Sequence, residues 1–389
     1  MEKITFRSIV SFTFLLMSVI LTGCSSKPIS VRMMETASSE VMVVDESLVT
    51  ETRDMLLSDI AEEFRVVRFE NRDEAFFQPG MPAFSDNYIA VGKKPVKLFT
   101  RDGKYLCDIG AVGNGPGEYF VGAYDVLIDE PSDRIYVAGF GNKINCYDLR
   151  GNFIGVAKLN KPLNKGKLFL NSDSTVSAVQ LCFREDNENA FVAANFSVGD
   201  AAGDTVCFVY APQLAVNSVD EEGRSVGFNH ELWSFRCSPR QTFHTTFNDT
   251  LYHYNAPANR LEAVFKLDMT PERRDGAFFV YQELPAHVFA NIVGGVNKGT
   301  IVVDKQTREA WRAGRKVNDF FFDLKWGWSF HDGYMFDVFE PLELLDKLQK
   351  AIDEGDISST HREAVEEFMS TLSENDNNIM LVARLKEFR

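Results

Sequence analysis

Short runs of alternating apolar and polar residues, separated by turn residues, fill the chain from about residue 60 onward. The runs 64–69, 88–91, 96–99 and 105–109 have the length and alternation of half-buried β-strands. The last two runs are joined by a turn that contains Asp102-Gly103, and Asp-Gly is among the strongest short signals for a β-hairpin. The pattern therefore predicts a protein built from short antiparallel strands.

The same hairpin phrase recurs along the chain. Arg101-Asp102-Gly103 aligns with Leu149-Arg150-Gly151, about 48 residues further on, and a more divergent copy begins at 248–254. Repeats of roughly 40–50 residues made of β-meanders are typical of β-propellers, in which neighbouring blades bury each other's faces around a channel. A β-sandwich with chance similarity between its hairpins is the alternative.

The grouping of these strands predicts an all-β fold, a six-bladed β-propeller with a short helical insertion in the last blade. We expect the propeller domain to span residues 56–389. Its blades are expected at 64–110, 119–159, 168–210, 233–267, 278–311 and from residue 320 to the C-terminus. The last blade contains two helical patterns, one at 341–352 and one that follows the capping box Thr360-His361-Arg362-Glu363. A final strand at 379–383 is expected to pair with the strand at 64–69 and close the ring.

The N-terminus has the pattern of a bacterial lipoprotein signal peptide. Basic residues precede an apolar run at 9–20, which is too short to cross a bilayer as a helix. The following Leu21-Thr22-Gly23-Cys24 resembles a lipobox, so residues 1–23 are expected to be removed and the Cys24 thiol to be lipidated. An ordinary signal peptide is the alternative. We expect residues 24–55 to form a lipid-anchored tether and N-terminal segment, and the membrane contact to be this anchor.

Charge and cysteine content narrow the function classes. The chain has 41 Lys and Arg against 56 Asp and Glu, a net charge of −15, which excludes broad nucleic-acid binding because phosphate neutralisation needs an excess of cations. Five cysteines follow Cys24, at wide spacing and without a CxxC motif. We expect them to be buried small side chains and not a disulfide framework or metal ligands: they are Cys107, Cys146, Cys182, Cys207 and Cys237.

A glycine-rich heptapeptide, Gly113-Asn114-Gly115-Pro116-Gly117-Glu118-Tyr119, follows one of the predicted strands. Glycine permits positive φ and proline fixes a turn residue, so this segment is expected to be a crossover between blades. A loop whose exposed amides cradle an anion is the alternative, with Glu118 and Tyr119 as candidate binding residues. No lysine follows in a P-loop pattern, which argues against nucleotide binding.

With the preceding Asp108-Ile109-Gly110 and the closing strand at 379–385, this heptapeptide resembles the signature of six-bladed β-propeller lipoproteins, TolB-like and NHL-like, that occur in Gram-negative cell envelopes. The resemblance spans most of the chain and implies the propeller fold. It also implies a location in the cell envelope, at the periplasmic face or the surface of the outer membrane. The family has no established activity, so the resemblance implies no reaction.

Motifs for common catalytic centres are absent from the sequence. The six histidines show no HxH or HExxH spacing and there is no GxSxG elbow, so neither a metal nor another cofactor is expected. His244 flanks a repeat turn and is a candidate for the channel mouth, or else a hydrogen-bonded structural residue. The carboxylates that could form a catalytic pair are Glu118, Asp125, Asp129 and Asp323.

The segment Lys325-Trp326-Gly327-Trp328 is the main candidate for ligand binding. In a strand, Trp326 and Trp328 would share a face and offer a flat surface to a sugar ring, with Lys325 beside it. Packing of these rings in the core is the alternative.

These observations favour a non-enzymatic, lipid-anchored β-propeller that acts as a binding or scaffold module for an envelope protein or glycan. The alternative is a carboxylate-dependent hydrolase or lyase with its site at the channel mouth. The choice follows from a repeat-built scaffold without a recognisable catalytic motif.

Overall fold

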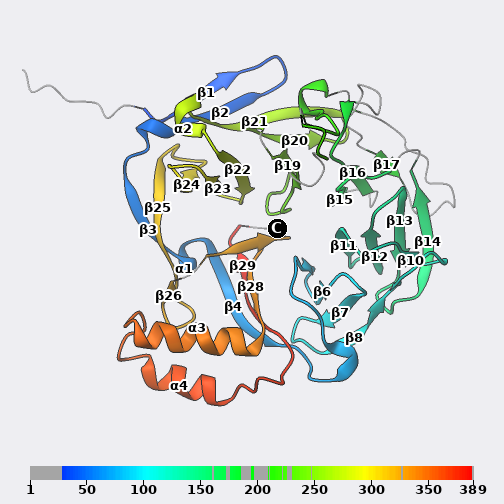
Figure 1. Ribbon diagram of the computed structural model, residues 1–389, viewed down its shortest axis with the longest axis vertical. Coiled ribbons are helices and arrows are strands. Elements are labelled where there is room, and N and C mark those ends of the chain that lie inside the picture. Colours follow the sequence, from blue (N-terminus) through cyan, green and yellow to red (C-terminus); the bar gives the residue numbers. More distant parts are fainter. Residues whose placement is uncertain are drawn as a thin grey trace, which may run out of the picture.

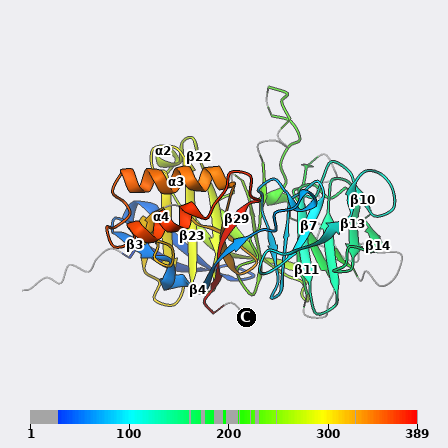
Figure 2. The same ribbon diagram turned by 90° about the horizontal axis from the view of Figure 1, so that it is seen from below.

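The fold is a ring of radially arranged antiparallel sheets around a central channel, a β-propeller (Figure 1). In side view the sheets stand next to one another and form a flattened disc (Figure 2). The computed structural model describes residues 29–159, 162–171, 176–184, 194–196, 209, 211–220, 222–225, 230–246, 248–325 and 327–387. The expected signal peptide and Cys24 lie outside these residues.

Five of the radial sheets contain four or more strands and are complete blades. Three of them, with their strands ordered from the channel outward, are β5 (Ala83–Phe84), β6 (Tyr88–Val91), β7 (Val96–Thr100) and β8 (Tyr105–Ile109); β11 (Asp125–Asp129), β12 (Arg134–Ala138), β13 (Lys143–Tyr147) and β14 (Phe153–Lys158); β18 (Leu232–Trp233), β19 (Gln241–Thr245), β20 (Thr250–Asn255) and β21 (Arg260–Asp268). The other two are β22 (Ala277–Glu283), β23 (His287–Gly294), β24 (Gly299–Asp304) and β25 (Ala310–Asn318), extended by β26 (Leu324–Lys325), and β27 (Ser329–His331), β28 (Tyr334–Phe339), β29 (Ile379–Leu385) and β4 (Ala61–Arg68).

The expected count of six complete blades is not confirmed. Between β14 and β18 the described residues form a sheet of three strands, β15 (Lys167–Leu170), β16 (Val176–Val179) and β17 (Ala194–Phe196). This is the part of the chain, 168–210, for which the hairpin pattern predicted a full blade, and residues 185–193 and 197–208 of it are outside the described part. The propeller fold itself is confirmed.

The ring closes as the sequence predicted. Strand β29 lies between β28 and β4 in an antiparallel arrangement, with Met380 opposite Val67 and Ile379 opposite Arg68. Every residue of β29 except Arg384 is buried. A strand that is apolar on both faces needs a hydrogen-bonded neighbour on each side and cover on both faces. Strand β28 is the inner neighbour of β29, and β4 is its outer neighbour.

The predicted helical insertion is also present, on the outside of the ring (Figure 2). Helix α3 (Pro341–Asp353) and helix α4 (Arg362–Ser370) connect β28 to β29. Pro341 occupies the first turn of α3, where its missing N–H costs nothing, and Leu344, Leu348 and Val365 are buried in a shared apolar cluster. The expected capping box does not form, because α4 begins at Arg362 and its N-cap is His361 and not Thr360.

The N-terminal segment supplies strands to the outer edges of the blades. The hairpin of β1 (Val31–Glu35) and β2 (Glu40–Asp45) pairs in parallel with β21, and β3 (Thr52–Leu56) pairs in parallel with β25. The short helix α1 (Leu57–Ile60) then leads into β4, and α2 (Pro271–Arg274) lies near the hairpin (Figure 1). The hairpin and β3 therefore cover the outer edges of two blades.

A buried ion pair fixes this segment to the ring. Glu46, which follows β2, is fully buried and accepts hydrogen bonds from Arg273 at 2.6 and 2.9 Å and from Arg312. Burial alone raises the pKa of a carboxyl, but these two guanidinium groups outweigh it and hold the pKa of Glu46 below its ordinary value.

The cysteines lie as expected where they are described. Cys146, Cys182 and Cys237 are buried and Cys107 is half-buried, all four as free thiols, while Cys207 is outside the described residues. Burial raises the pKa of the Cys146 thiol to about 11, which makes it unreactive. No helix among the described residues has the length and apolar character needed to cross a membrane.

Replacing Glu46 with Gln is expected to lower the free energy of unfolding at pH 7 by about 1–3 kcal/mol, because Arg273 and Arg312 lose their charged acceptor. A carboxyl with a lowered folded-state pKa stabilises the fold above its unfolded pKa, and this contribution is lost as the pH falls through the folded pKa. The difference between wild type and Glu46→Gln in urea denaturation should therefore shrink below about pH 4. The exposed Glu40→Gln is the matched control, and an equal effect of both changes would contradict the role of Glu46.

Candidate functional site

A buried arginine lies at the centre of the ring. Arg236 follows β18 in a left-handed conformation, with φ of 50°, and its side chain is 8% exposed. Its guanidinium bonds to Asp125 at 2.8 Å and to Asp332 at 2.5 Å, and its Nη2 lies 2.8 Å from His331 Nε2. It also donates to two backbone carbonyls, those of Val126 at 2.8 Å and Leu168 at 3.1 Å.

This arrangement joins the inner strands of several sheets. Burial lowers the pKa of an arginine, but Asp125 and Asp332 more than offset it and raise the pKa of Arg236, so the group stays charged. The two carboxylates also accept from backbone amides, Asp332 from Phe84 at 3.0 Å and Asp125 from Leu168 at 2.7 Å. One guanidinium thus ties β5, β11, β15 and the β27–β28 turn to the segment after β18.

The network determines the protonation of His331. Arginine is a donor only, so His331 Nε2 must accept, and the proton of the neutral ring lies on Nδ1. Burial and the charge of Arg236 lower the pKa of His331 well below its ordinary value, which keeps the ring neutral. His331 is 2% exposed, and its Nδ1 has no hydrogen-bond partner among the described residues.

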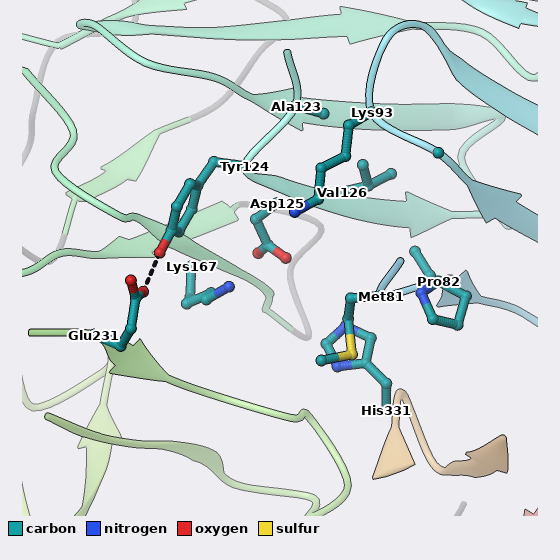
Figure 3. A pocket seen from close by; sticks show the side chains of 12 residues that line it. Met81, Pro82, Lys93, Ala123, Tyr124, Asp125, Val126, Lys167, Glu231 and His331 are labelled. Carbon is teal, nitrogen blue, oxygen red and sulfur yellow. Dashed lines mark hydrogen bonds between the residues drawn. The ribbon is translucent and has the colours of Figure 1, made fainter. Parts of the chain in front are cut away.

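A cavity of about 310 Å³ opens above this network at the channel mouth (Figure 3). Its walls come from the segments that lead into β5, β11, β15 and β18 and from the β6–β7 loop. The lining residues are Met81, Pro82, Ala83, Gly92, Lys93, Ala123, Tyr124, Asp125, Val126, Lys167, Glu231 and His331.

Both carboxylates of this channel-mouth cavity are already bonded to protein donors. Asp125 binds Arg236, and Glu231 accepts from the Tyr124 hydroxyl and from the Lys165 amine. Burial and the hydrogen bond to Glu231 raise the pKa of Tyr124, so its hydroxyl remains protonated and donates. Carboxylates held in this way are poorly suited to the proton transfers of a glycosidase-like mechanism.

The two lysines of the cavity are not paired in this manner. Within the described part of the chain, neither the Lys93 nor the Lys167 amine forms an ion pair or a hydrogen bond. The Lys167 amine lies 4.8 Å from the centre of the Tyr124 ring, and burial lowers the pKa of Lys167. The cavity therefore offers more hydrogen-bond donors than its own acceptors can satisfy.

A second cavity of about 770 Å³ adjoins the first and shares Gly92 and Lys93 with it. Phe76 and Phe77 form its apolar side, and Phe76 is 42% exposed. The Lys97 amine at its edge is bonded to Asp108 at 2.8 Å and to the Glu74 carbonyl at 2.5 Å. A larger, partly apolar cavity thus lies next to the channel-mouth cavity at the β6–β7 loop.

The glycine-rich heptapeptide lies between β8 and β11, where it links two blades as the crossover interpretation predicts. It spans the short parallel pair β9 (Ala111–Val112) and β10 (Glu118–Tyr119). Tyr119 is buried, accepts from the Val96 amide at 2.7 Å and donates to the Ile109 carbonyl at 3.0 Å. The Gly115 amide donates to Glu118 at 2.7 Å, so the anion that this loop holds is the carboxylate of Glu118 itself.

His244 lies in the core and not at the channel mouth. Its Nε2 is 3.2 Å from the Phe279 carbonyl and 3.3 Å from the Tyr281 amide, so it bridges β19 to β22. Burial lowers the pKa of His244 to about 3, which leaves the ring neutral.

In the tryptophan segment, Lys325 is the last residue of β26, whereas Gly327 and Trp328 lie between β26 and β27. Trp328 is 6% exposed and packs edge-on against Phe330 in the core, and Lys325 bonds to Asp356 near the helices. Trp326 is outside the described residues. Trp328 does not lie on the exposed face of a strand, as the sequence pattern predicted for it, because β26 ends at Lys325 and β27 begins at Ser329.

The carboxylates proposed as catalytic partners are not brought together. Asp125 and Asp129 stand at opposite ends of β11, and Glu118 belongs to the crossover. Asp323 lies 3.5 Å from His361 beside α4. Of these four, only Asp125 lines the channel-mouth cavity.

The sequence pattern did not identify four residues of the cavity and the network behind it, which are Arg236, His331, Lys93 and Lys167. The segment Ser234-Phe235-Arg236-Cys237 places one cation in an otherwise small or apolar stretch, and this was the available signal for a buried charge. Its partners are as far as 111 positions away in the sequence, so no local pattern links them.

Comparison with known proteins places this architecture in a family. The family model described as Domain of unknown function (DUF4934) matches residues 39–384. The chain belongs to this family. The DUF4934 match begins in the β1–β2 hairpin, so it includes strands of the N-terminal segment.

Two solved structures are similar to this DUF4934 chain. The "Putative exported protein" of Bacteroides fragilis aligns with a TM-score of 0.59 and 14% identity, over 87% of this chain and 98% of that one. A member of the DUF4221 family from Bacteroides vulgatus aligns with a TM-score of 0.45 and 12% identity, over 84% and 97%. The first shares the fold. No match is found among curated proteins.

In the DUF4934 chain, Arg236→Met is expected to lower the free energy of unfolding by about 3–5 kcal/mol, because it leaves Asp125 and Asp332 buried without their cation. Urea denaturation measures this effect. The control is Arg150→Met, whose exposed pair with Asp133 should contribute almost nothing. Equal midpoints for the two variants would show that Arg236 does not hold the ring together.

A second change tests the crossover. Gly117 has φ of 71°, and a Cβ there would lie 2.8 Å from the Phe153 ring, so Gly117→Ala should lower the free energy of unfolding by at least about 1–2 kcal/mol. Gly155→Ala, at a strand position with no atom near the added Cβ, should be neutral or slightly stabilising. A neutral Gly117→Ala would contradict the structural role of the heptapeptide.

Proposed function

We propose that this DUF4934 protein is an extracytoplasmic, lipid-anchored binding module whose ligand occupies the channel-mouth cavity. The observation that carries the proposal is the concave, polar cavity of about 310 Å³ whose lysines and His331 Nδ1 lack partners within the described residues. Enclosed polar cavities on rigid scaffolds, lined by crossover segments, are the usual location of ligand sites.

Of the two ligand classes, an envelope protein or a glycan, the cavity favours a glycan. A site of this volume is at the lower end of the range for small-molecule pockets and admits a sugar residue more readily than the flat surface of a folded partner. The adjoining cavity of about 770 Å³ leaves room for the next residues of a chain.

The geometry supports binding better than hydrolysis. A hydrolase or lyase of the kind considered above needs one carboxyl that can hold a proton and one that is free to accept one. The two carboxylates of the cavity, Asp125 and Glu231, are each bonded to a cation. We therefore favour a module without catalytic turnover.

The proposal also covers where the protein is located, how it is anchored and how many blades its propeller has. The basic residues, apolar run and Leu21-Thr22-Gly23-Cys24 at the N-terminus support export and lipidation, and the similar Bacteroides fragilis protein is named as exported. We propose attachment to the envelope through Cys24, with periplasmic or surface exposure. We also propose that β15–β17 belong to a sixth blade, which the strand order around the channel supports.

Filling the cavity should abolish binding. Met81 lines the cavity and is 46% exposed, so Met81→Trp is expected to block the mouth without disturbing the core. Binding of the detergent-solubilised protein to an array of bacterial envelope glycans measures the effect.

Met34→Trp is the matched control, because Met34 is 44% exposed on β1 and does not line the cavity. The proposal predicts that Met34→Trp binds like wild type and Met81→Trp does not. Unchanged binding by Met81→Trp, or catalytic turnover of the bound glycan, would contradict it.

A further inference from the structure

The channel-mouth cavity has a local excess of positive charge in an acidic protein. Four cations line the cavity or lie directly behind it, against three carboxylates, while the whole chain has a net charge of −15. The cations are Lys93, Lys165, Lys167 and Arg236, and the carboxylates are Asp125, Glu231 and Asp332. Lys165 pairs with Glu231, and Arg236 pairs with Asp125 and Asp332. Lys93 and Lys167 are therefore the two cations available to a ligand.

The unpaired donors converge. Figure 3 shows the amines of Lys93 and Lys167 both turned toward the space between Tyr124 and His331. His331 is 2% exposed and lines the cavity, and its protonated Nδ1 has no acceptor among the described residues. His331 Nδ1 is itself buried, so the donors that a ligand in the cavity can reach are the two lysine amines.

Asp125 supplies an acceptor beside these donors. Among the described residues, Asp125 accepts hydrogen bonds from Arg236 and from the Leu168 amide, and both are made to Oδ2. Its Oδ1 therefore remains able to accept from a ligand hydroxyl at the cavity wall. Sulfate, which has no proton to donate at neutral pH, would leave this acceptor unused, whereas a hydroxylated acid would use it.

We infer that the cavity binds a carboxylate-bearing sugar, with the ligand carboxylate between the Lys93 and Lys167 amines and a ring hydroxyl donating to Asp125. The inference rests on the proposed function, since it names the ligand class of that same cavity. Ammonium–carboxylate hydrogen bonds are the strong, charge-assisted kind, and about 310 Å³ suits one sugar ring. The sugar is either a free acid or one residue of an acidic polysaccharide.

Calorimetric titration of the detergent-solubilised full chain tests the inference. The probes are D-glucuronate, D-glucose, inorganic phosphate, an aspartate-rich peptide and an oligomer of glucuronate. Glucuronate should bind at least about tenfold more tightly than glucose, which has the same ring without the charge. Tighter binding of the oligomer than of the monomer would identify an acidic polysaccharide as the ligand. Equal binding of the two would identify the free sugar acid as the ligand.

The variant Lys167→Met keeps the length of the side chain and removes its charge. Glucuronate affinity should fall about tenfold or more, while the melting temperature stays level or rises, because a partly buried amine without an ion pair does not stabilise the fold. Lys104→Met, an exposed lysine on the β7–β8 turn, is the matched control and should leave the affinity unchanged.

Several outcomes would overturn the inference. Equal affinity for glucose, phosphate binding as tight as that of glucuronate, preference for the peptide, or no effect of Lys167→Met would each do so. If glucuronate does not bind but Met81→Trp still abolishes glycan binding, the acidic-sugar inference fails and the proposed function stands. If glucuronate does not bind and Met81→Trp leaves glycan binding unchanged, the acidic-sugar inference and the proposed function both fail.

Discussion

Burial of one guanidinium at the centre of the ring is the constraint on which the site depends. A charge cannot remain inside a protein unless it is paired and its donors are satisfied, and Arg236 meets this demand with two carboxylates, one imidazole nitrogen and two carbonyls. Those partners come from several different sheets. The inner strands must therefore converge on a single point, and this convergence sets the floor of the channel-mouth cavity.

The same network explains the chemical character of the cavity. Because Asp125 is used by Arg236 and Glu231 by Lys165 and Tyr124, the carboxylates that line the cavity are held by protein donors. Because Arg236 donates to His331 Nε2, the ring proton is placed on Nδ1. The result is a cavity of donors with few free acceptors, which is suited to holding an oxygen-rich ligand and poorly suited to moving protons.

Much of the fold could be predicted because its determinants are local. Asp102-Gly103 specifies a hairpin, the repeated meander specifies the blade architecture, and the all-apolar run at 379–383 needs a sheet partner on each side, which β28 and β4 provide. The number of blades was harder to predict, because the region between β16 and β18 lacks clear hairpin signals. The capping box expected at Thr360 does not form, because the helix begins one residue later and His361 is its N-cap.

The site could be predicted only in small part. Asp125 was identified as a carboxylate of interest, but its partners Arg236 and Asp332 are distant in the sequence and meet it only in the closed ring. Local signals pointed instead to Tyr119, Trp328 and His244, whose polar or aromatic groups are used in packing. Residue type alone does not distinguish a buried structural group from one that lines a cavity.

The most direct measurement is a crystal structure of the protein soaked with D-glucuronate. The account predicts difference density for one sugar ring in the channel-mouth cavity, with its carboxylate within hydrogen-bond distance of Lys93 and Lys167, and with the Arg236 network unchanged. An empty cavity at saturating glucuronate, or a sugar whose carboxylate points away from the two lysines, would contradict it.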